Sequence, residues 1–177
     1  EYQPAYETAT ARSLHHLVQQ SHRHGHNHFD LDFTGLRPLS GMFDTLSQME
    51  DTHLTLILRG ELGSNILNYA QGGTYYLESV QNWCADSARD ATFYVQHANN
   101  RFGEYSHGCT MYLLNGGSDC AYAAKSGTIY IQNGELPNRV DDNNVTFYTP
   151  NLSIILPPPY NQNERREYII KATLNHI

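Results

Sequence analysis

Charge is scarce in this sequence of 177 residues: only 16% of them are Asp, Glu, Lys or Arg, against about 25% in an ordinary domain. The 11 basic residues form no run, and the formal net charge is −7. Because contacts to phosphate need clustered Lys and Arg, we expect no nucleic-acid partner. The polar surface must come from neutral groups, and a surface rich in Tyr, Asn and Ser is typical of extracytoplasmic recognition domains.

Long apolar runs are missing too. No stretch approaches the ~18–20 apolar residues of a membrane-spanning helix, so we expect no membrane span. The chain starts at Glu1 without a signal-peptide pattern, which we interpret as a mature secreted chain or an excised domain. Glycosylation sequons at Asn144 and Asn151 also favour export. The predicted location is therefore secreted or cell-surface.

The apolar periodicity predicts an α+β fold in a single domain of residues 1–177, with a helical part at about 5–50. Residues 5–20 contain neither Gly nor Pro and place apolar side chains three and four positions apart, which describes one helical face. Pro4 precedes this segment and Gly25 follows it, as helix start and stop signals do. A second helix is predicted at 42–50, and a short strand at 29–33.

The remainder, about 52–177, is β-rich. Runs of β-branched, aliphatic and aromatic residues alternate with Gly/Asn/Asp turn signals. The predicted strands are 52–62, 74–80, 91–97, 109–114, 128–132, 145–149, 152–156 and 167–174. Short strands at regular intervals favour a mostly antiparallel β sandwich or strongly twisted sheet. The segment 82–90 is compatible with a short helix, and we identify no internal repeat.

The densest chemical feature is a histidine run at alternate positions: His22, His24, His26 and His28. In an extended segment alternate side chains point to the same side, so several imidazoles could gather. Zn²⁺ prefers about four ligands, and imidazole is one of its usual ligands. The run therefore predicts a site for zinc or another divalent metal; the alternatives are an exposed loop and a pH-sensitive segment.

Three cysteines suggest at most one disulfide. Cys109 and Cys120 flank a Gly-Gly turn, which makes them the preferred pair, with Cys84 and Cys109 as the alternative. A sharper hypothesis makes Cys84 a nucleophile at a helix N-terminus, assisted by His107 as the base. Arg59, at the end of an apolar strand, is a second catalytic candidate because guanidinium binds phosphate or carboxylate in a bidentate way.

The abundant tyrosines suggest a ligand surface. Tyr105 and Tyr122 lie in polar loops beside Asn100 and Asp119, and stacking faces with amides and carboxylates suit a sugar or peptide. We therefore expect a secreted or surface-exposed binding module, adhesin-like, lectin-like or receptor-binding, whose partner is a carbohydrate or a protein receptor. The alternatives are a secreted hydrolase or toxin-like transferase or nuclease, and a structural subunit of an extracellular assembly. Whether the protein is an enzyme stays open, with binding favoured.

Overall fold

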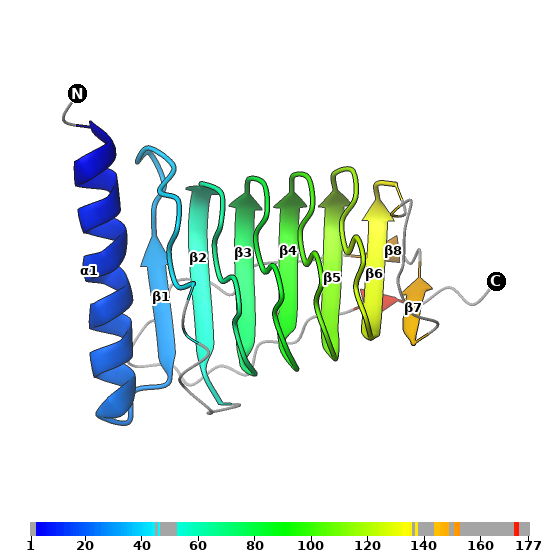
Figure 1. Cartoon of the computed structure of the whole chain (residues 1–177), viewed down its shortest axis with the longest axis horizontal. Coiled ribbons are helices and arrows are strands. Elements are labelled where there is room, and N and C mark those ends of the chain that lie inside the picture. The colour runs from blue at the N-terminus through cyan, green and yellow to red at the C-terminus, as the bar shows by residue number, and fades with distance from the viewer. Residues whose placement is uncertain are drawn as a thin grey trace.

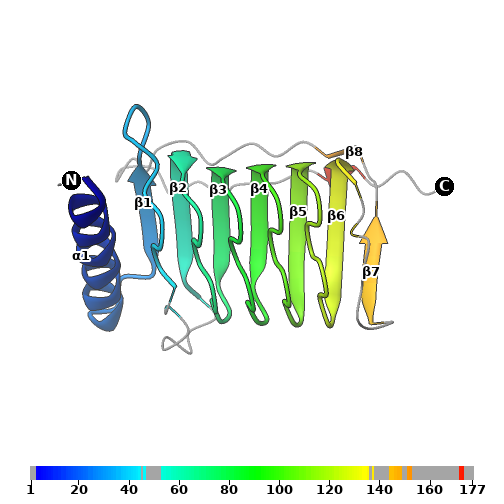
Figure 2. The ribbon, with the colours of Figure 1, turned by 45° about the horizontal axis from the view of Figure 1, so that its top comes forward.

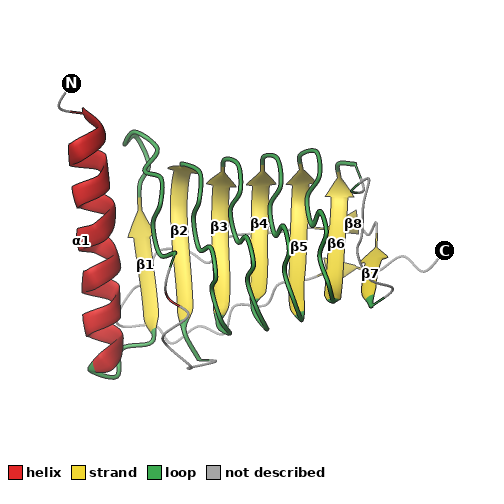
Figure 3. Ribbon diagram, viewed as in Figure 1, coloured by secondary structure: helices red, strands yellow, loops and turns green. Residues whose placement is uncertain are grey.

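The computed structural model describes residues 3–44, 46, 53–135, 137, 144–148, 151–152 and 172–173. One helix, α1 (Gln3–Arg23), precedes seven strands (Figures 1 and 3). The strands are β1 (His28–Asp32), β2 (Thr55–Leu62), β3 (Thr74–Val80), β4 (Thr92–Ala98), β5 (Cys109–Gly116), β6 (Gly127–Asn133) and β7 (Val145–Tyr148). Two short strands, β8 (Asn151–Leu152) and β9 (Ala172–Thr173), pair with each other in antiparallel orientation.

All seven strands lie in one sheet in chain order, and every neighbouring pair is parallel. The chain is a parallel β-solenoid of about five turns, which Figure 2 shows as a row of strands linked by similar crossovers. The predicted antiparallel sandwich is therefore wrong. The predicted strands lie close to the observed ones. The turn signals between them do not form hairpins, because each belongs to a crossover that returns the chain to the end of the sheet where the previous strand began.

The solenoid has an 18-residue repeat, which corrects the expectation that no repeat exists. Thr-x-Tyr recurs at residues 74, 92, 110, 128 and 146, each time at the start of a strand or one residue after it. Because one repeat equals one turn, equivalent residues stack in register along the axis. This arrangement makes each turn depend on its neighbours for burial, as in other solenoids.

Opposite the strands lies a second wall, which we call the turn wall: residues 63–73, 81–91, 99–108 and 117–126. Every second residue along its first half has a left-handed backbone conformation, for example Trp83 (φ 54°), Ala85 (φ 56°) and Ser87 (φ 55°). The backbone N–H groups of these residues point alternately to the next and the previous turn. The predicted helix at 82–90 is therefore absent, since a right-handed helix has negative φ throughout.

The core fills the space between the strand wall, β1–β7, and the turn wall. Tyr75 and Phe93 point inward from β3 and β4 and stack with ring centroids 5.1 Å apart. Phe102 reaches them from the turn wall, its ring edge-on to Phe93 at 5.5 Å. These side chains are at most 1% exposed, so the aromatic cluster joins the two walls.

Helix α1 covers the β1 end of the solenoid (Figure 1). Its buried side chains Ala11 and Val18 join the same core, and the His15 ring stacks on Phe43 at 6.2 Å. This confirms the predicted N-terminal helix and gives it a role, because the terminal turn of a solenoid needs a cap for its exposed apolar end. No helix in the described part of the chain has the length and apolar character to cross a bilayer.

The second predicted helix, at 42–50, is not formed where the chain is described: residues 41–44 are bends and turns, with Phe43 at φ 63°. The other residues of that segment, apart from Leu46, lie outside the described residues. The strand predicted at 29–33 is confirmed as β1. Of the segments predicted as strands at 152–156 and 167–174, only Leu152 and Ala172–Thr173 are described.

Candidate binding surface

The outward face of the strand wall carries two columns of nearly identical side chains. One column starts with His28 on β1 and is threonine on the next six strands: Thr55, Thr74, Thr92, Thr110, Thr128 and Thr146. The other starts with Asp30 and Ile57 and continues as Tyr76, Tyr94, Tyr112, Tyr130 and Tyr148. We call the two columns the Thr–Tyr face. Because strand residues alternate between faces, every Thr and Tyr is outward while the residue between them enters the core.

The tyrosine rings stack on one another along the solenoid axis. Successive centroids are 4.9, 4.8, 4.6 and 5.0 Å apart, with interplanar angles of 11°, 5°, 3° and 16°. These distances match the ~4.7–4.9 Å between neighbouring strands, so the sheet itself sets the stack. Each inner ring therefore has both faces occupied by its neighbours. What the column offers a partner is ring edges and hydroxyl groups.

Partial burial affects the phenols. Burial raises the pKa of Tyr76. It is also the main cause of the raised pKa of Tyr94 and Tyr112, to which the neighbouring phenols add a smaller effect. A charged phenolate would be poorly solvated inside the stack and would face another hydroxyl within a few ångströms. The raised pKa values therefore keep the hydroxyls of Tyr76, Tyr94 and Tyr112 protonated at physiological pH.

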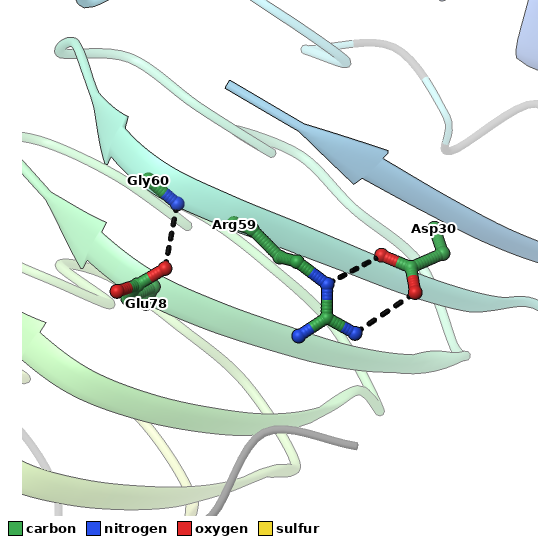
Figure 4. Close-up of polar contacts among 4 residues, drawn as sticks. All are labelled: Asp30, Arg59, Gly60 and Glu78. Atoms are coloured by element: carbon green, nitrogen blue, oxygen red, sulfur yellow. Dashed lines mark hydrogen bonds and ion pairs between the residues drawn. The ribbon is translucent and has the colours of Figure 1, made fainter. Parts of the chain in front are cut away.

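Charge gathers at the β1 end of the same face (Figure 4). The Arg59 guanidinium donates to both oxygens of Asp30, from Nε at 2.9 Å and Nη2 at 2.8 Å, and both side chains are 12% exposed. Gly60 interrupts the pairing of β2 with β3, and its N–H donates to a carboxylate oxygen of Glu78 at 2.7 Å. Further along, the equivalent outward positions are neutral: Gln96, Leu114 and Gln132.

A polar ladder follows at the carboxyl ends of the strands. Alternation breaks there, because positions 78 and 79 of β3 both lie outside the core. The ladder consists of Glu61, Ser79, His97, Asn115 and Asn133, in register on β2 to β6. It borders an open groove with a volume of about 410 Å³.

The histidine run does not form a cluster. His22 is the penultimate residue of α1 and His24 follows the helix, so the four residues are not on one extended segment. The Nδ1 atoms of His22 and His24 lie 3.2 and 2.8 Å from the carbonyls of His26 and Gln20, where the rings can cap the helix end. Among described residues, no three His, Cys, Asp or Glu side chains are placed to share a metal ion. Zinc binding by this run stays a sequence-based prediction.

The expected disulfide is not formed, whether as Cys109–Cys120 or as Cys84–Cys109: all three cysteines are buried free thiols. Cys109 begins β5, whereas Cys120 lies on the turn wall, so the ten residues between them cross the solenoid rather than close a hairpin. Cys84 and Cys120 share one column of the turn wall with Phe102 between them. Two turn spacings exceed the ~7 Å limit for bridging Cα atoms.

Cys84 does not have the surroundings of a nucleophile. Burial raises the pKa of its thiol to about 12, and no helix follows it to lower the value. Its polar contacts are with backbone groups, including the carbonyls of Gly63 and Asn82. Arg59, the other catalytic candidate, pairs with Asp30 within the sheet.

The predicted ligand residues lie on the turn wall, away from the Thr–Tyr face. Tyr105 donates its backbone N–H to the carbonyl of Tyr122 at 3.1 Å, so the two occupy adjacent turns. Asn100 accepts from the backbone and hydroxyl of Ser118 at 3.2 and 2.9 Å, next to Asp119. The structure thus brings the four predicted residues onto one wall, with no groove described among them.

The sequence analysis did not predict the Thr–Tyr face or the polar ladder, although the 18-residue repeat that forms them is present in the sequence. A search at a fixed period of 18 residues would have aligned the Thr-x-Tyr triplets and placed the tyrosines in one column. Comparisons with protein-family models, curated proteins and solved structures gave no match to this chain. Its function must therefore be argued from its own surfaces.

Proposed function

We propose that this protein is a non-catalytic binding module that docks a protein partner through the Thr–Tyr face. The observation that carries the proposal is the stacked tyrosine column beside an unbroken threonine column. Tyrosine is enriched at protein interfaces because its ring offers contact area while its hydroxyl can hydrogen-bond. Stacking holds these rings in place before any partner arrives, which lowers the entropic cost of binding.

The outward side of the strand wall approaches the size of a protein interface. Six spacings of ~4.8 Å by about seven residues at ~3.3 Å each give at most roughly 650 Å², of which the Thr–Tyr face is a part. Each partner in a standard interface contributes about 800 Å². A complex of standard size would therefore use the Thr–Tyr face together with the surface around it.

The orientation of the rings favours a protein over a sugar on this face. Sugars bind aromatic residues by stacking on an exposed ring face, and the inner rings here have none to offer. A secreted or cell-surface location, expected from the sequence, fits a receptor-binding role and stays a prediction. A catalytic role has less support, since both catalytic candidates have structural partners or deep burial.

The test compares two Lys substitutions in affinity capture from cell-surface extracts. Thr110→Lys places a charge at the centre of the Thr–Tyr face, and Tyr105→Lys places the same charge on the turn wall, where the sequence predicted the ligand. Melting temperatures check that both variants fold. A partner retained by Tyr105→Lys and lost by Thr110→Lys supports the proposal; the reverse pattern, or equal retention, contradicts it.

Treating the extract with protease or with glycosidases separates the two classes of partner. Capture that survives glycosidases and disappears after proteolysis indicates a protein. Capture that disappears with the glycans moves the assignment to a carbohydrate and overturns the choice made here.

A further inference from the structure

The polar ladder has a defined hydrogen-bond direction. The Asn133 side-chain amide donates to Oδ1 of Asn115 at 3.0 Å, which orients the Asn115 amide nitrogen toward β4. That nitrogen lies 3.1 Å from the Gln96 carbonyl and 3.1 Å from Nδ1 of His97. An amide nitrogen donates but cannot accept, so Nδ1 of His97 must be the acceptor. The network therefore assigns the proton of the neutral imidazole to Nε2.

Nε2 is the ring nitrogen that Asn115 does not contact. His97 is exposed, and the ladder positions on the strands before it, Ser79 and Glu61, line the same groove. The ladder thus presents a donor, Nε2–H, followed by a hydroxyl and then a carboxylate that only accepts. Donor and acceptor are separated by about two strand spacings, roughly 10 Å.

The groove beside the ladder has the size of a small-molecule site. Its volume is about 410 Å³, within the ~300–1,000 Å³ usual for such sites. Gly116 and Gly117 contribute only backbone to its wall, and Gln81 and Asn99 add amides. None of the described lining residues is Lys or Arg.

We propose that this groove binds a neutral saccharide, whose hydroxyls accept from His97 Nε2–H and donate to Glu61. A ligand here must accept at one end and donate at the other, and a hydroxyl group does both. An anion would face the Glu61 carboxylate with no cation to compensate. An ammonium group could pair with Glu61 but could not accept from His97. The site is separate from the Thr–Tyr face, because no residue of that face lines the groove.

The first experiment is a titration of the full chain followed by amide chemical shifts. Methyl glucoside, methyl galactoside and methyl mannoside are the neutral probes, with glucuronate as the anionic control. We expect saturable shifts at the backbone of Ser79, His97 and Asn115 with at least one neutral probe, and at least about fivefold weaker binding of glucuronate. No shift with any neutral probe well above millimolar concentration overturns the proposal, as do shifts that map to the turn wall.

Two variants then test the polarity of the ladder. Asn115→Leu removes the donor to Nδ1, so the imidazole proton is no longer fixed on Nε2. His97→Phe keeps an aromatic ring and removes the Nε2–H donor. We expect His97→Phe to weaken binding of the neutral probe about tenfold or more and Asn115→Leu to weaken it by a smaller factor, while Gln132→Glu, which adds a carboxylate one column away, leaves the affinity unchanged. Equal affinity in Asn115→Leu, His97→Phe and the parent chain contradicts the assignment, even if protein docking at the Thr–Tyr face holds.

Discussion

The strand wall and the turn wall are both hydrogen-bonded from turn to turn, but they use different backbone conformations. In the strand wall, each extended strand pairs with its parallel neighbours. In the turn wall, Trp83 donates forward to Asn100 at 3.2 Å, while Ala85 donates backward to Ile66 at 2.8 Å. The same alternation continues one turn later, where Arg101 donates to Ser118 and Gly103 to Cys84. Alternating left-handed and right-handed backbone conformations thus let the turn wall form hydrogen bonds between successive turns. The strand wall forms its bonds between turns with extended strands.

The two walls also differ in the residue types that suit their backbone conformations. The strand wall alternates inward apolar with outward Thr and Tyr residues, which is a visible sequence pattern. The turn wall places left-handed residues at Leu67, Ala85 and Ala121, where Gly would be the usual choice. It therefore carries backbone strain that the strand wall does not, of order 1–2 kcal/mol per residue. The difference suggests substitutions that affect one wall and spare the other.

The largest effect is expected from Phe102→Ala, which removes the aromatic contact between the walls. The ring is fully buried and sits edge-on to Phe93. Loss of the ring and the cavity left behind should lower the free energy of unfolding by about 3–5 kcal/mol. Denaturant titration measures it, with Tyr69→Ala as the control because Tyr69 is 56% exposed on the same wall; the control should change the free energy of unfolding by no more than about 0.5 kcal/mol. A cost below about 1 kcal/mol would show that the walls do not depend on this contact.

Alkaline pH should weaken the fold through both walls. Burial raises the pKa of Cys84 to about 12 and of Cys120 to about 11 on the turn wall, and raises the pKa of Tyr94 and Tyr112 on the strand wall. Because these folded-state values exceed the unfolded ones, the stabilisation is complete below the ordinary pKa, about 8.5 for Cys and 10 for Tyr. It is lost as the pH rises through the raised values, by a few kcal/mol for the deeply buried thiols.

Paired variants separate the two contributions in melting temperatures recorded across this alkaline range. Cys84→Ala with Cys120→Ala should remove the turn-wall part of the loss that begins near pH 9, while Cys109 on β5, whose pKa burial raises to about 11, keeps its own part. Tyr94→Phe with Tyr112→Phe should remove part of the loss that begins near pH 10. Identical pH profiles for the parent chain and both pairs contradict the assignment.

Glycine should have opposite effects on the two walls. Tyr69 is 56% exposed and has a φ of 59°, so Tyr69→Gly relieves a left-handed conformation and should leave stability unchanged or raise it by up to about 1 kcal/mol. Thr110→Gly on the strand wall should cost about 1 kcal/mol, because glycine weakens strands. Urea midpoints of the two variants give the comparison, and a change of the same sign in both argues against it.

The smallest expected effect is a stabilisation within the turn wall. Ser106 is buried, and its hydroxyl has no hydrogen-bond partner among the described residues. The positions one turn away in the same column are Ala88 and Ala124, both buried. Ser106→Ala should therefore raise the free energy of unfolding by about 1 kcal/mol, since an unsatisfied polar group leaves the core. Ala88→Ser is the matched control and should cost about as much; a destabilised Ser106→Ala would mean that the hydroxyl has a partner.

Sequence reasoning succeeded where the pattern is local. The helix at α1 and the strands at β1–β7 follow from three- and four-residue or alternate apolar spacing, and β3 was placed to the residue. It gave the wrong strand pairing, because Asn99-Asn100 and Gly116-Gly117 resemble hairpin turns, whereas each of them begins a crossover between parallel strands. It failed on the site because the Tyr column exists only once equivalent residues of successive turns are aligned.

The sequence by itself determined which segments are extended, which of their side chains are apolar, and that the chain is poor in charged residues and rich in tyrosine. Tertiary structure alone decided that the strands are parallel, since inward and outward alternation is the same in parallel and antiparallel sheets. The direction depends on the crossover, and that depends on left-handed residues such as Trp83, Ala85 and Ser87, which carry no local signature of that conformation. Only the return of the chain every 18 residues brings the tyrosines into contact and aligns Asn133, Asn115 and His97 into a ladder.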